Sequence, residues 1–297
     1  MSPLTLSGQT YEYHDNIAQN TAWRTSFNAL SQQTFGLDFE PWYQQGYWQD
    51  DYHPHVFIHD HQVVANVSFN RIPTEYQGVA KTYGQIGTVM THPEHRHRGL
   101  ADALMQQVLT RWLPQCDALY LYANASVLAF YPRYGFVPAQ THQHQRRLSP
   151  RPSPCLALNM NQAPDVARLR RYFAYGNGYA ELPLRGNWGL LMFYCSQHLA
   201  QCVFYLPEFD VVAIVAEEDD HTLLYDVYGA AKAPLDVIMA ALAKSAQRPV
   251  ALGFTPKNDN GFEVVVPPAD DAYLFVHQDK DHPFAERALT LPALAKA

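Results

Sequence analysis

Hydrophobic positions in the first half of the chain alternate between helical and strand spacing. Apolar residues recur every fourth position from Leu100 to Trp112, which predicts a helix with one buried stripe, and Pro114 marks its end. Two β-rich runs flank Asp60 and His61, a pair typical of a hairpin turn. The remaining predictions here are a helix over residues 16–35, strands over 55–59, 63–71, 82–91, 119–123 and 143–148, and a short helix over 124–134.

The second half shows a similar alternation of predicted strands and helices. Alternating prolines between Leu148 and Cys155 favour extended backbone, so we expect a stiff linker and two domains, 1–150 and 151–297. Strand–helix–strand order in both halves predicts an α/β fold, with mixed sheets and parallel neighbours at each crossover. The elements expected in the second half are helices over 165–174 and 234–246 and strands over 202–206, 210–216, 222–228, 250–254, 263–266 and 273–276.

Composition narrows the class of protein. Hydrophobic residues make up 47% and charged residues 16% of 297 residues, which is enough apolar material for buried cores. The net charge of -7 argues against nucleic acid and anionic membranes as partners. Four cysteines without a CxxC spacing, no signal peptide and no long apolar run favour a cytoplasmic protein without disulfides. The acidic run 217–220 between two strands is expected to be a solvated hairpin tip.

One segment combines features that bind anions. A strand ending near Thr91 is followed by Arg96-His-Arg-Gly-Leu-Ala101, which crosses into the predicted helix. Exposed N–H groups at a helix N-terminus attract phosphate, Gly99 permits close approach of backbone, and Ala101 leaves space. Neither a Walker loop nor a GxGxxG fingerprint is present. The pattern therefore predicts a pyrophosphate cradle of another type.

Two spaced motifs resemble those of a known family. Arg96-x-x-Gly99-x-Ala101 is similar to the (Q/R)xxGx(G/A) motif of the GCN5-related N-acetyltransferases, and the strand 119–123, Asn124 and FYPRYGF (130–136) are similar to that family's second motif. The resemblance covers about residues 35–148. Its details look like the subgroup of Eis-type acetyltransferases, which have a second, degenerate acetyltransferase-like domain and then a sterol-carrier-like domain. The chain is too short to be expected to hold that third domain.

The resemblance implies an N-acetyltransferase that uses acetyl-coenzyme A and transfers its acetyl group directly to a primary amine in a ternary complex. By this likeness, Val89 donates its N–H to the thioester oxyanion, and Tyr131 protonates the departing thiolate. The acceptor is a small-molecule or peptide amine that the sequence does not name, and a symmetric dimer is the default oligomer. The residues that the resemblance assigns to the coenzyme are Val89, Met90, Thr91, Arg96, His97, Arg98, Gly99, Leu100, Ala101, Asn124 and Tyr131.

The second half departs from this pattern. The segment 225–234 holds the corresponding strand-to-helix position but has no Arg-x-x-Gly-x-Gly/Ala, and Pro234 stands where backbone N–H groups would face phosphate. No FYxxxGF follows. We therefore expect a second acetyltransferase-like fold that does not bind coenzyme A.

Several roles stay open at this level. Asn124 can be a helix N-cap, Tyr131 a packed side chain, and Arg98 part of a solvated face. The histidines lack a metal-ligand spacing such as HExxH, so no metal is expected. The alternatives to an enzyme of this family are a non-catalytic acyl-coenzyme A sensor and a metal hydrolase. The aromatic residues between Trp42 and Tyr52 can line an acceptor pocket or simply pack. The general base is open among Glu40, Asp50, Asp51, Glu75, His53 and His55, and water can also act without any of them.

Overall fold

The computed structural model describes residues 4–268, 270–285 and 287–296. Its larger sheet has eight strands in the order β1-β2-β3-β4-β5-β6-β15-β7. Neighbours are antiparallel except β5 and β6, which run parallel. The strands are β1 (Leu4–Leu6), β2 (Gln9–His14), β3 (Tyr52–His59), β4 (Gln62–Tyr76), β5 (Val79–Thr91), β6 (Ala118–Ala123), β7 (Phe136–Pro138) and β15 (Tyr273–His277).

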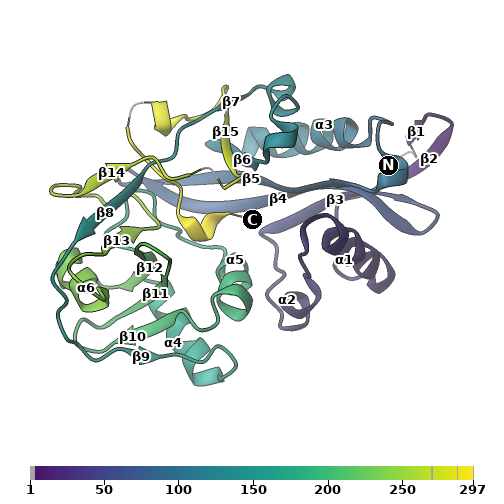
Figure 1. Ribbon diagram of the computed structural model, residues 1–297. Helices are drawn as coiled ribbons and strands as arrows, with labels where there is room; N and C mark the ends of the chain where they lie inside the picture. Colours follow the sequence, from purple (N-terminus) through teal and green to yellow (C-terminus); the bar gives the residue numbers. More distant parts are fainter. Residues whose placement is uncertain (1–3, 269, 286, 297) are drawn as a thin grey trace.

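Helices cover both faces of this sheet (Figure 1). The helix α3 (Leu100–Trp112) lies on one face and buries the predicted stripe against β4 and β5. The helices α1 (Thr21–Phe35) and α2 (Glu40–Gln44) lie on the other face. The Asn20 side chain accepts from the Trp23 N–H, so α1 begins later than the predicted residue 16. Short helical turns complete this lobe at η1 (Pro93–His95), η2 (Leu113–Gln115), η3 (Ala125–Val127) and η4 (Tyr131–Tyr134).

The smaller sheet has seven strands in the order β14-β8-β13-β12-β11-β10-β9. Its one parallel pair is β12 and β13, the pair that the second predicted crossover requires. Its elements, with the helices and turns of the second lobe, are β8 (Gln143–Arg147), β9 (Leu156–Ala157), β10 (Val203–Leu206), β11 (Val211–Glu217), β12 (Thr222–Gly229), β13 (Pro249–Leu252), β14 (Glu263–Val265), α4 (Ala163–Phe173), α5 (Trp188–Phe193), the π-helical turn η5 (Tyr194–His198), α6 (Leu235–Leu242), η6 (Pro283–Ala285) and η7 (Ala293–Ala295).

The sheets do not divide the chain at residue 150, as the expected domains 1–150 and 151–297 require. The strand β8, expected in the first domain, pairs with β13 and β14 of the smaller sheet. The strand β15, expected in the second domain, lies between β6 and β7 of the larger sheet. The expected domain boundary fails because β6 and β7 do not pair with each other. The strand β15 lies between them and forms antiparallel hydrogen bonds with both. The two lobes are therefore interlaced.

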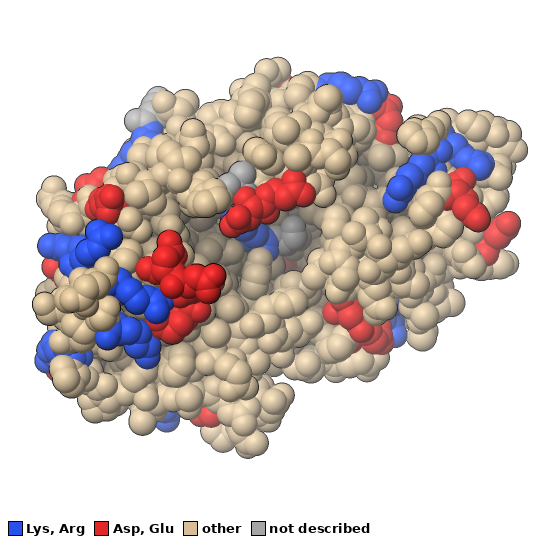
Figure 2. All heavy atoms as spheres, viewed as in Figure 1, with Lys and Arg blue, Asp and Glu red and all other residues tan. Residues whose placement is uncertain are grey.

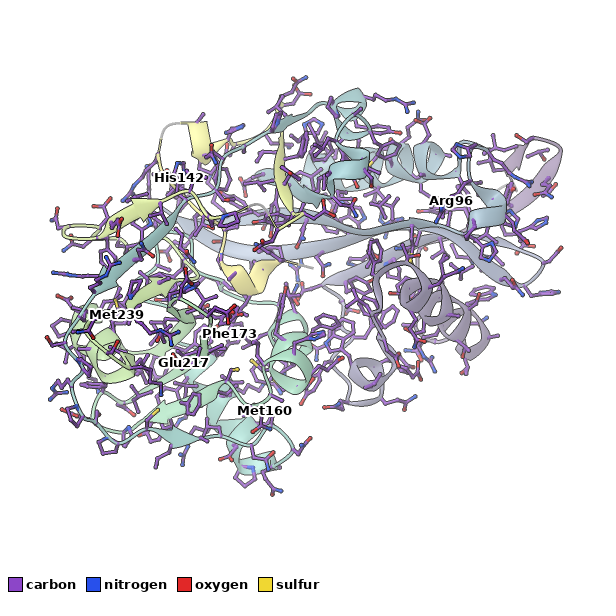
Figure 3. The ribbon with its side chains drawn as sticks, viewed as in Figure 1. Arg96, His142, Met160, Phe173, Glu217 and Met239 are labelled. Carbon is purple, nitrogen blue, oxygen red and sulfur yellow. The ribbon has the colours of Figure 1, made fainter. Side chains whose placement is uncertain are left out.

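A shared apolar core also joins the lobes. Tyr83 and Tyr120 of the larger sheet pack in one buried cluster with Leu191 of α5 and Val212 and Tyr228 of the smaller sheet. Figure 3 shows Phe173 and Met239 in the second lobe and Arg96 far from them, at the turn before α3.

The aromatic residues between Trp42 and Tyr52 belong to the packing between helices and sheet. Trp42 is 3% exposed, and its Nε1 donates to the Gly189 carbonyl of α5 at 2.7 Å. A Cβ on Gly189 would lie 2.2 Å from the Tyr47 carbonyl oxygen, so only glycine allows this approach. The packing alternative for these aromatics thus holds, and α5 is locked to the first lobe.

In the second lobe, side chains and backbone occupy the region beyond the last paired residues of the parallel strands β12 and β13. The pairing ends at Leu224 and Leu252. Beyond it, Phe254 is 1% exposed, the Glu181 N–H donates to the Thr255 carbonyl at 2.8 Å, and Pro234 caps α6 without a side-chain hydrogen bond.

A buried carboxyl lies in this filled space. Asp226 is 1% exposed and accepts from Asn177 Nδ2 at 2.5 Å and from the Val227 N–H at 2.9 Å. Burial raises its pKa from 3.8 to about 6. The folded protein therefore binds more protons than the unfolded chain between these two values, so this group costs stability as the pH rises through that range.

We expect Asp226→Asn to raise the free energy of unfolding at pH 7 by about 1–3 kcal/mol, because the amide keeps the Oδ1 acceptor and removes the buried charge. The gain should disappear below about pH 4. Urea unfolding at pH 4, 5.5 and 7 measures it. The exposed Asp236, paired with Arg146, is the control: Asp236→Asn should change stability by less than about 0.5 kcal/mol. An equal effect of both substitutions would contradict the assignment.

Candidate active site

The parallel strands β5 and β6 separate before they end. Their pairing runs from Tyr83–Ala118 to Ile86–Leu121 and stops there, although β5 continues to Thr91. Beyond Ile86 the strands diverge, and the backbone of both is available to a ligand lying between them.

A β-bulge turns β5 away from β4 at this level. The register passes from Ser68–Gly87 to Asn66–Met90, so Thr88 and Val89 lie opposite a single residue of β4. Thr88 has φ +44°, in the left-handed region that a threonine rarely adopts. Such a bulge directs backbone groups of residues 88 and 89 away from the ladder.

Buried polar side chains hold the bulge in place. Asn66 Nδ2 donates to the Thr88 carbonyl at 2.7 Å and to Ser68 Oγ at 2.9 Å. Thr88 Oγ1 donates to Ser68 Oγ at 2.7 Å, and the Tyr52 hydroxyl lies 2.8 Å from Ser68 Oγ. Because Asn66 and Ser68 are 0% exposed, these bonds are not exchanged with water. The network stabilises the strained Thr88.

The N-terminus of α3 faces the gap between the strands. Gly99 is its N-cap with φ +82°, and a Cβ there would meet no atom within 4 Å. Arg96 is exposed, with its Nε donating to the Thr91 carbonyl at 3.1 Å. The first-turn N–H groups, the exposed Arg96 and the open space above Gly99 fit a bound phosphate.

Arg98, by contrast, contacts the β1–β2 hairpin. Its guanidinium donates to the Gln9 side chain of β2 and, at 2.8 Å, to the Glu94 carbonyl. It ties the loop before α3 to the β1–β2 hairpin and does not line the cleft.

One cleft of about 1000 Å³ brings the other predicted residues together. Its volume lies at the upper end of the range of ligand-binding pockets. The predicted residues that line it are Val89, Met90, Thr91, Arg96, His97, Gly99, Leu100, Ala101, Asn124 and Tyr131.

Tyr131 lies at the start of η4 and is 5% exposed, among Phe130, Phe136 and Phe275. Burial raises the pKa of its hydroxyl to about 12, so the group stays protonated throughout the neutral range. Gly135 has φ +82° and caps this turn in the left-handed conformation, as the sequence predicts.

Asn124 is not a side-chain cap. It precedes η3, where its side chain makes no capping hydrogen bond, and it is exposed to the cleft. The predicted short helix over 124–134 is in fact the two turns η3 and η4.

None of the six candidate general bases lines the cleft. Glu40, Asp51 and Glu75 form ion pairs with arginines elsewhere. His55 is 0% exposed, and its Nε2 accepts from Trp112 Nε1 at 2.8 Å. Burial lowers its pKa to about 3, so it is neutral. His53 lies against Trp112, with ring centroids 4.5 Å apart and ring planes tilted by 36°.

Within residues 4–268, 270–285 and 287–296, no three His, Cys, Asp or Glu side chains are placed to hold a metal ion. In the same ranges, no helix has the length and apolar character needed to cross a membrane.

Several lining residues carry no signal in the sequence motifs. Asp271 and Ala272 reach the cleft because β15 is inserted beside β6, which no local pattern indicates. Asp102 follows the cradle motif, and its carboxylate binds Arg133 and Tyr134. Three further lining residues, Tyr122, Phe130 and Arg133, lie within the second motif but were not assigned to the coenzyme. The other lining residues without such an assignment are Thr34, Phe35, Leu37, Ile86, Gly87, Thr88, His95, Ser126 and Val127.

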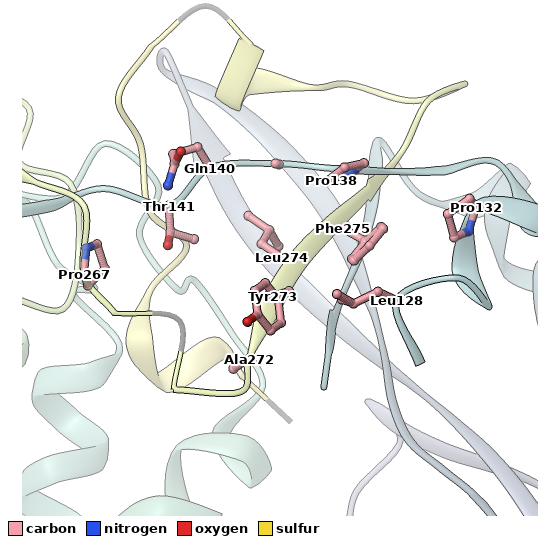
Figure 4. Close-up of a pocket in the computed structure, with 11 residues that line it drawn as sticks. Leu128, Pro132, Pro138, Gln140, Thr141, Pro267, Ala272, Tyr273, Leu274 and Phe275 are labelled. Atoms are coloured by element: carbon pink, nitrogen blue, oxygen red, sulfur yellow. The ribbon is translucent and has the colours of Figure 1, made fainter. Parts of the chain in front are cut away.

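A second, smaller cavity of about 370 Å³ lies beyond η4, against β15 (Figure 4). Leu128, Pro132, Leu274 and Phe275 make much of its wall. Tyr273 is its one ionisable lining residue, so this cavity lacks the donor set of the larger cleft.

The network around the bulge gives a testable role to Asn66. We expect Asn66→Ala to lower kcat by about tenfold, because the Thr88 carbonyl loses its partner and the bulge relaxes. Asn70→Ala is the matched control: Asn70 lies on the same strand, is 2% exposed, and has an amide nitrogen without a partner among the described residues. Its kcat should stay within about threefold of wild type. Equal losses in both variants would remove Asn66 from the positioning of the bulge.

Comparison with known proteins agrees with this geometry. Residues 11–139 match the family model described as an acetyltransferase (GNAT) domain. None of the curated proteins compared with the chain matches it.

Solved structures match across both lobes. A probable N-acyltransferase of unknown function from Enterococcus faecalis V583 aligns with 90% of this chain and 72% of its own, at 15% identity and TM-score 0.60. A GCN5-related N-acetyltransferase from Anabaena variabilis covers 90% and 72%, at 13% identity and TM-score 0.56. Eis1 from Mycobacterium abscessus covers 89% and 72%, at 15% identity and TM-score 0.52. At such identities the likeness shows the fold. Residues 11–139 therefore match the model of an acetyltransferase (GNAT) domain, and they lie within a two-lobed fold that the chain shares with these structures.

Proposed function

We propose that the chain is an N-acetyltransferase that binds acetyl-coenzyme A in the 1000 Å³ cleft and transfers the acetyl group to a primary amine. The observation that carries this proposal is the convergence on one cleft of the bulge at Val89, the N-terminus of α3 and the Tyr131 hydroxyl. Val89 would supply a backbone hydrogen-bond donor, the α3 N-terminus an anion-binding site, and Tyr131 a general acid.

The cradle suits the pyrophosphate. The N–H groups of Leu100 and Ala101 begin α3, and Gly99 leaves room for the phosphate to approach them. Arg96 and His97 add donors at the cleft wall. The diverging strands then accept the pantetheine arm between β5 and β6, where Asn124 offers a free amide.

The chemistry needs two groups from the chain. The Val89 N–H, directed by the bulge, would stabilise the negative oxygen that develops when the amine attacks the thioester carbon. As the C–S bond breaks, the Tyr131 hydroxyl would give its proton to the thiolate. No cysteine of the described residues lines the cleft, which supports direct attack over a covalent acyl-enzyme.

The second lobe would not bind a second coenzyme. Pro234 occupies the helix start, and Phe254 and Asp226 fill the space after the parallel pair. Its packing through α5 against Trp42 suggests a supporting role for the first lobe.

Turnover with an amine panel tests the proposal. Purified protein and acetyl-coenzyme A are mixed with polyamines, aminoglycosides, amino acids and peptides, and free thiol is measured. Thiol release that depends on one amine, with the matching acetylated product by mass spectrometry, supports an enzyme. Coenzyme binding without release for any amine would favour the non-catalytic sensor.

A further inference from the structure

A lysine from a distant part of the chain lies against the cleft. The turn η7 packs on β6, where the Tyr120 hydroxyl donates to the Ala295 carbonyl at 2.7 Å. The Tyr194 hydroxyl donates to the Lys296 carbonyl. One hydrogen bond from β6 and one from η5 thus fix the backbone of residues 295 and 296, and the Lys296 side chain extends from there.

Its amine lies at the level of the bulge. The Lys296 Nζ is 4.7 Å from the centroid of the Tyr122 ring. Tyr122 lines the cleft and comes one residue after Leu121, the last residue of β6 paired with β5. On β5, Thr88 and Val89 follow the paired Ile86 at the same opening. The amine therefore lies beside the opening that would hold the thioester.

The surroundings favour a neutral amine. Burial lowers the pKa of Lys296, and the nearby Asp270 only partly opposes this effect. No carboxylate of the described residues comes within 4.0 Å of its Nζ, whereas Lys81 has two such partners and Lys232 has one. Figure 2 shows acidic side chains beside a central hollow of this face and basic atoms within the hollow. Lys296 is exposed as a residue, so the lowering of its pKa is partial, and its place beside Tyr122 is the stronger observation. An amine without a salt bridge loses its proton more readily than a paired ammonium, and the neutral amine is the nucleophile.

We propose that Lys296 is an acetyl acceptor of this same site, so that the chain acetylates itself. This inference rests on the proposed acetyltransferase function. The Lys296 ammonium first releases a proton to solvent, and its lone pair attacks the thioester carbon. The C–N bond forms, the C–S bond breaks, and the second amine proton is lost as the thiolate gains one through Tyr131. The products are N-acetyl-lysine, free coenzyme A thiol and one proton.

Acetylation of Lys296 would affect the binding of an external amine acceptor. Acetyl-Lys296 would be neutral and larger, and it would lie where an external amine must approach Tyr122. An external acceptor of the alkylammonium class can rest its cation on the same ring. The two amines then compete for one position.

The experiment uses the full chain and acetyl-coenzyme A carrying ¹³C in the acetyl group. Peptide mass spectrometry follows the label at each lysine over time, and calorimetry on the same sample records coenzyme binding. We expect label at Lys296 to appear at least about tenfold faster than at Lys232, which pairs with Asp210 in the second lobe, because the Lys296 amine is held next to the thioester. Excess free coenzyme A should slow the label at Lys296 and leave Lys232 unchanged. The initial rate per molecule should not depend on protein concentration.

Two matched variants complete the design. Lys296→Arg should remove the fast label, while Lys232→Arg should leave it. Label that spreads evenly over all the lysines, or no label at Lys296 in protein that binds the coenzyme, would overturn the inference and leave the proposed function standing. If calorimetry records no coenzyme binding, the proposed function fails first, and the self-acetylation fails with it.

Discussion

Replacing Tyr131 by phenylalanine should lower kcat by about 100-fold or more, the usual worth of a general acid, while the Kd for acetyl-coenzyme A changes by less than about threefold. The ring is packed among Phe130, Phe136 and Phe275, so phenylalanine keeps the fold and removes only the proton donor. Because burial raises the pKa of Tyr131 to about 12, the hydroxyl is protonated from pH 6 to 9, and the loss should be constant over that range.

Steady-state thiol release and calorimetry measure these two quantities. Tyr134→Phe is the control, since Tyr134 lies on the same turn but donates to Asp102 instead of lining the cleft. Its kcat should stay within about threefold of wild type. A Tyr131→Phe enzyme with unchanged kcat would show that water or another group protonates the thiolate.

Gly99→Glu should abolish coenzyme binding, with a Kd raised by at least about 100-fold. Its carboxylate would enter the open space above the α3 N-terminus, and two unit charges about 4 Å apart near a protein surface repel by about 4 kcal/mol. The N–H groups would also be satisfied by the new carboxylate instead of phosphate. The shift of the melting temperature on adding acetyl-coenzyme A measures the binding.

Backbone strain needs a control, because Gly99 has φ +82°. Gly78 has φ +77°, equally open surroundings and a place in the β4–β5 hairpin turn away from the cleft. Gly78→Glu therefore carries the same strain and charge without meeting the phosphates. If both variants lose the melting shift, the effect is structural and the cradle is not supported.

Local patterns in the sequence predicted the elements that build the cleft. The stripe from Leu100 to Trp112 and the flanking strands are close to their predicted bounds, because a helix or strand needs only the periodicity of its own residues. The two motifs likewise contain ten predicted coenzyme residues that the structure brings to one cleft.

Other features depend on contacts that no local pattern carries. The strand over 273–277 was predicted, but its place between β6 and β7 pairs it with residues about 150 positions away. The division at residue 150 failed for this reason. Asp271 came to the cleft by the same long-range pairing and was not predicted. Lys296 reaches the Tyr122 ring through contacts of η7 that no local pattern indicates.

A calorimetric titration of the wild-type chain with acetyl-coenzyme A tests the central claim most directly. The account predicts saturable binding with one coenzyme per chain and a micromolar Kd, because the first lobe has an open cleft and the second lobe is filled. Two coenzymes per chain would contradict the filled second lobe. No binding at all would contradict the acetyltransferase function itself.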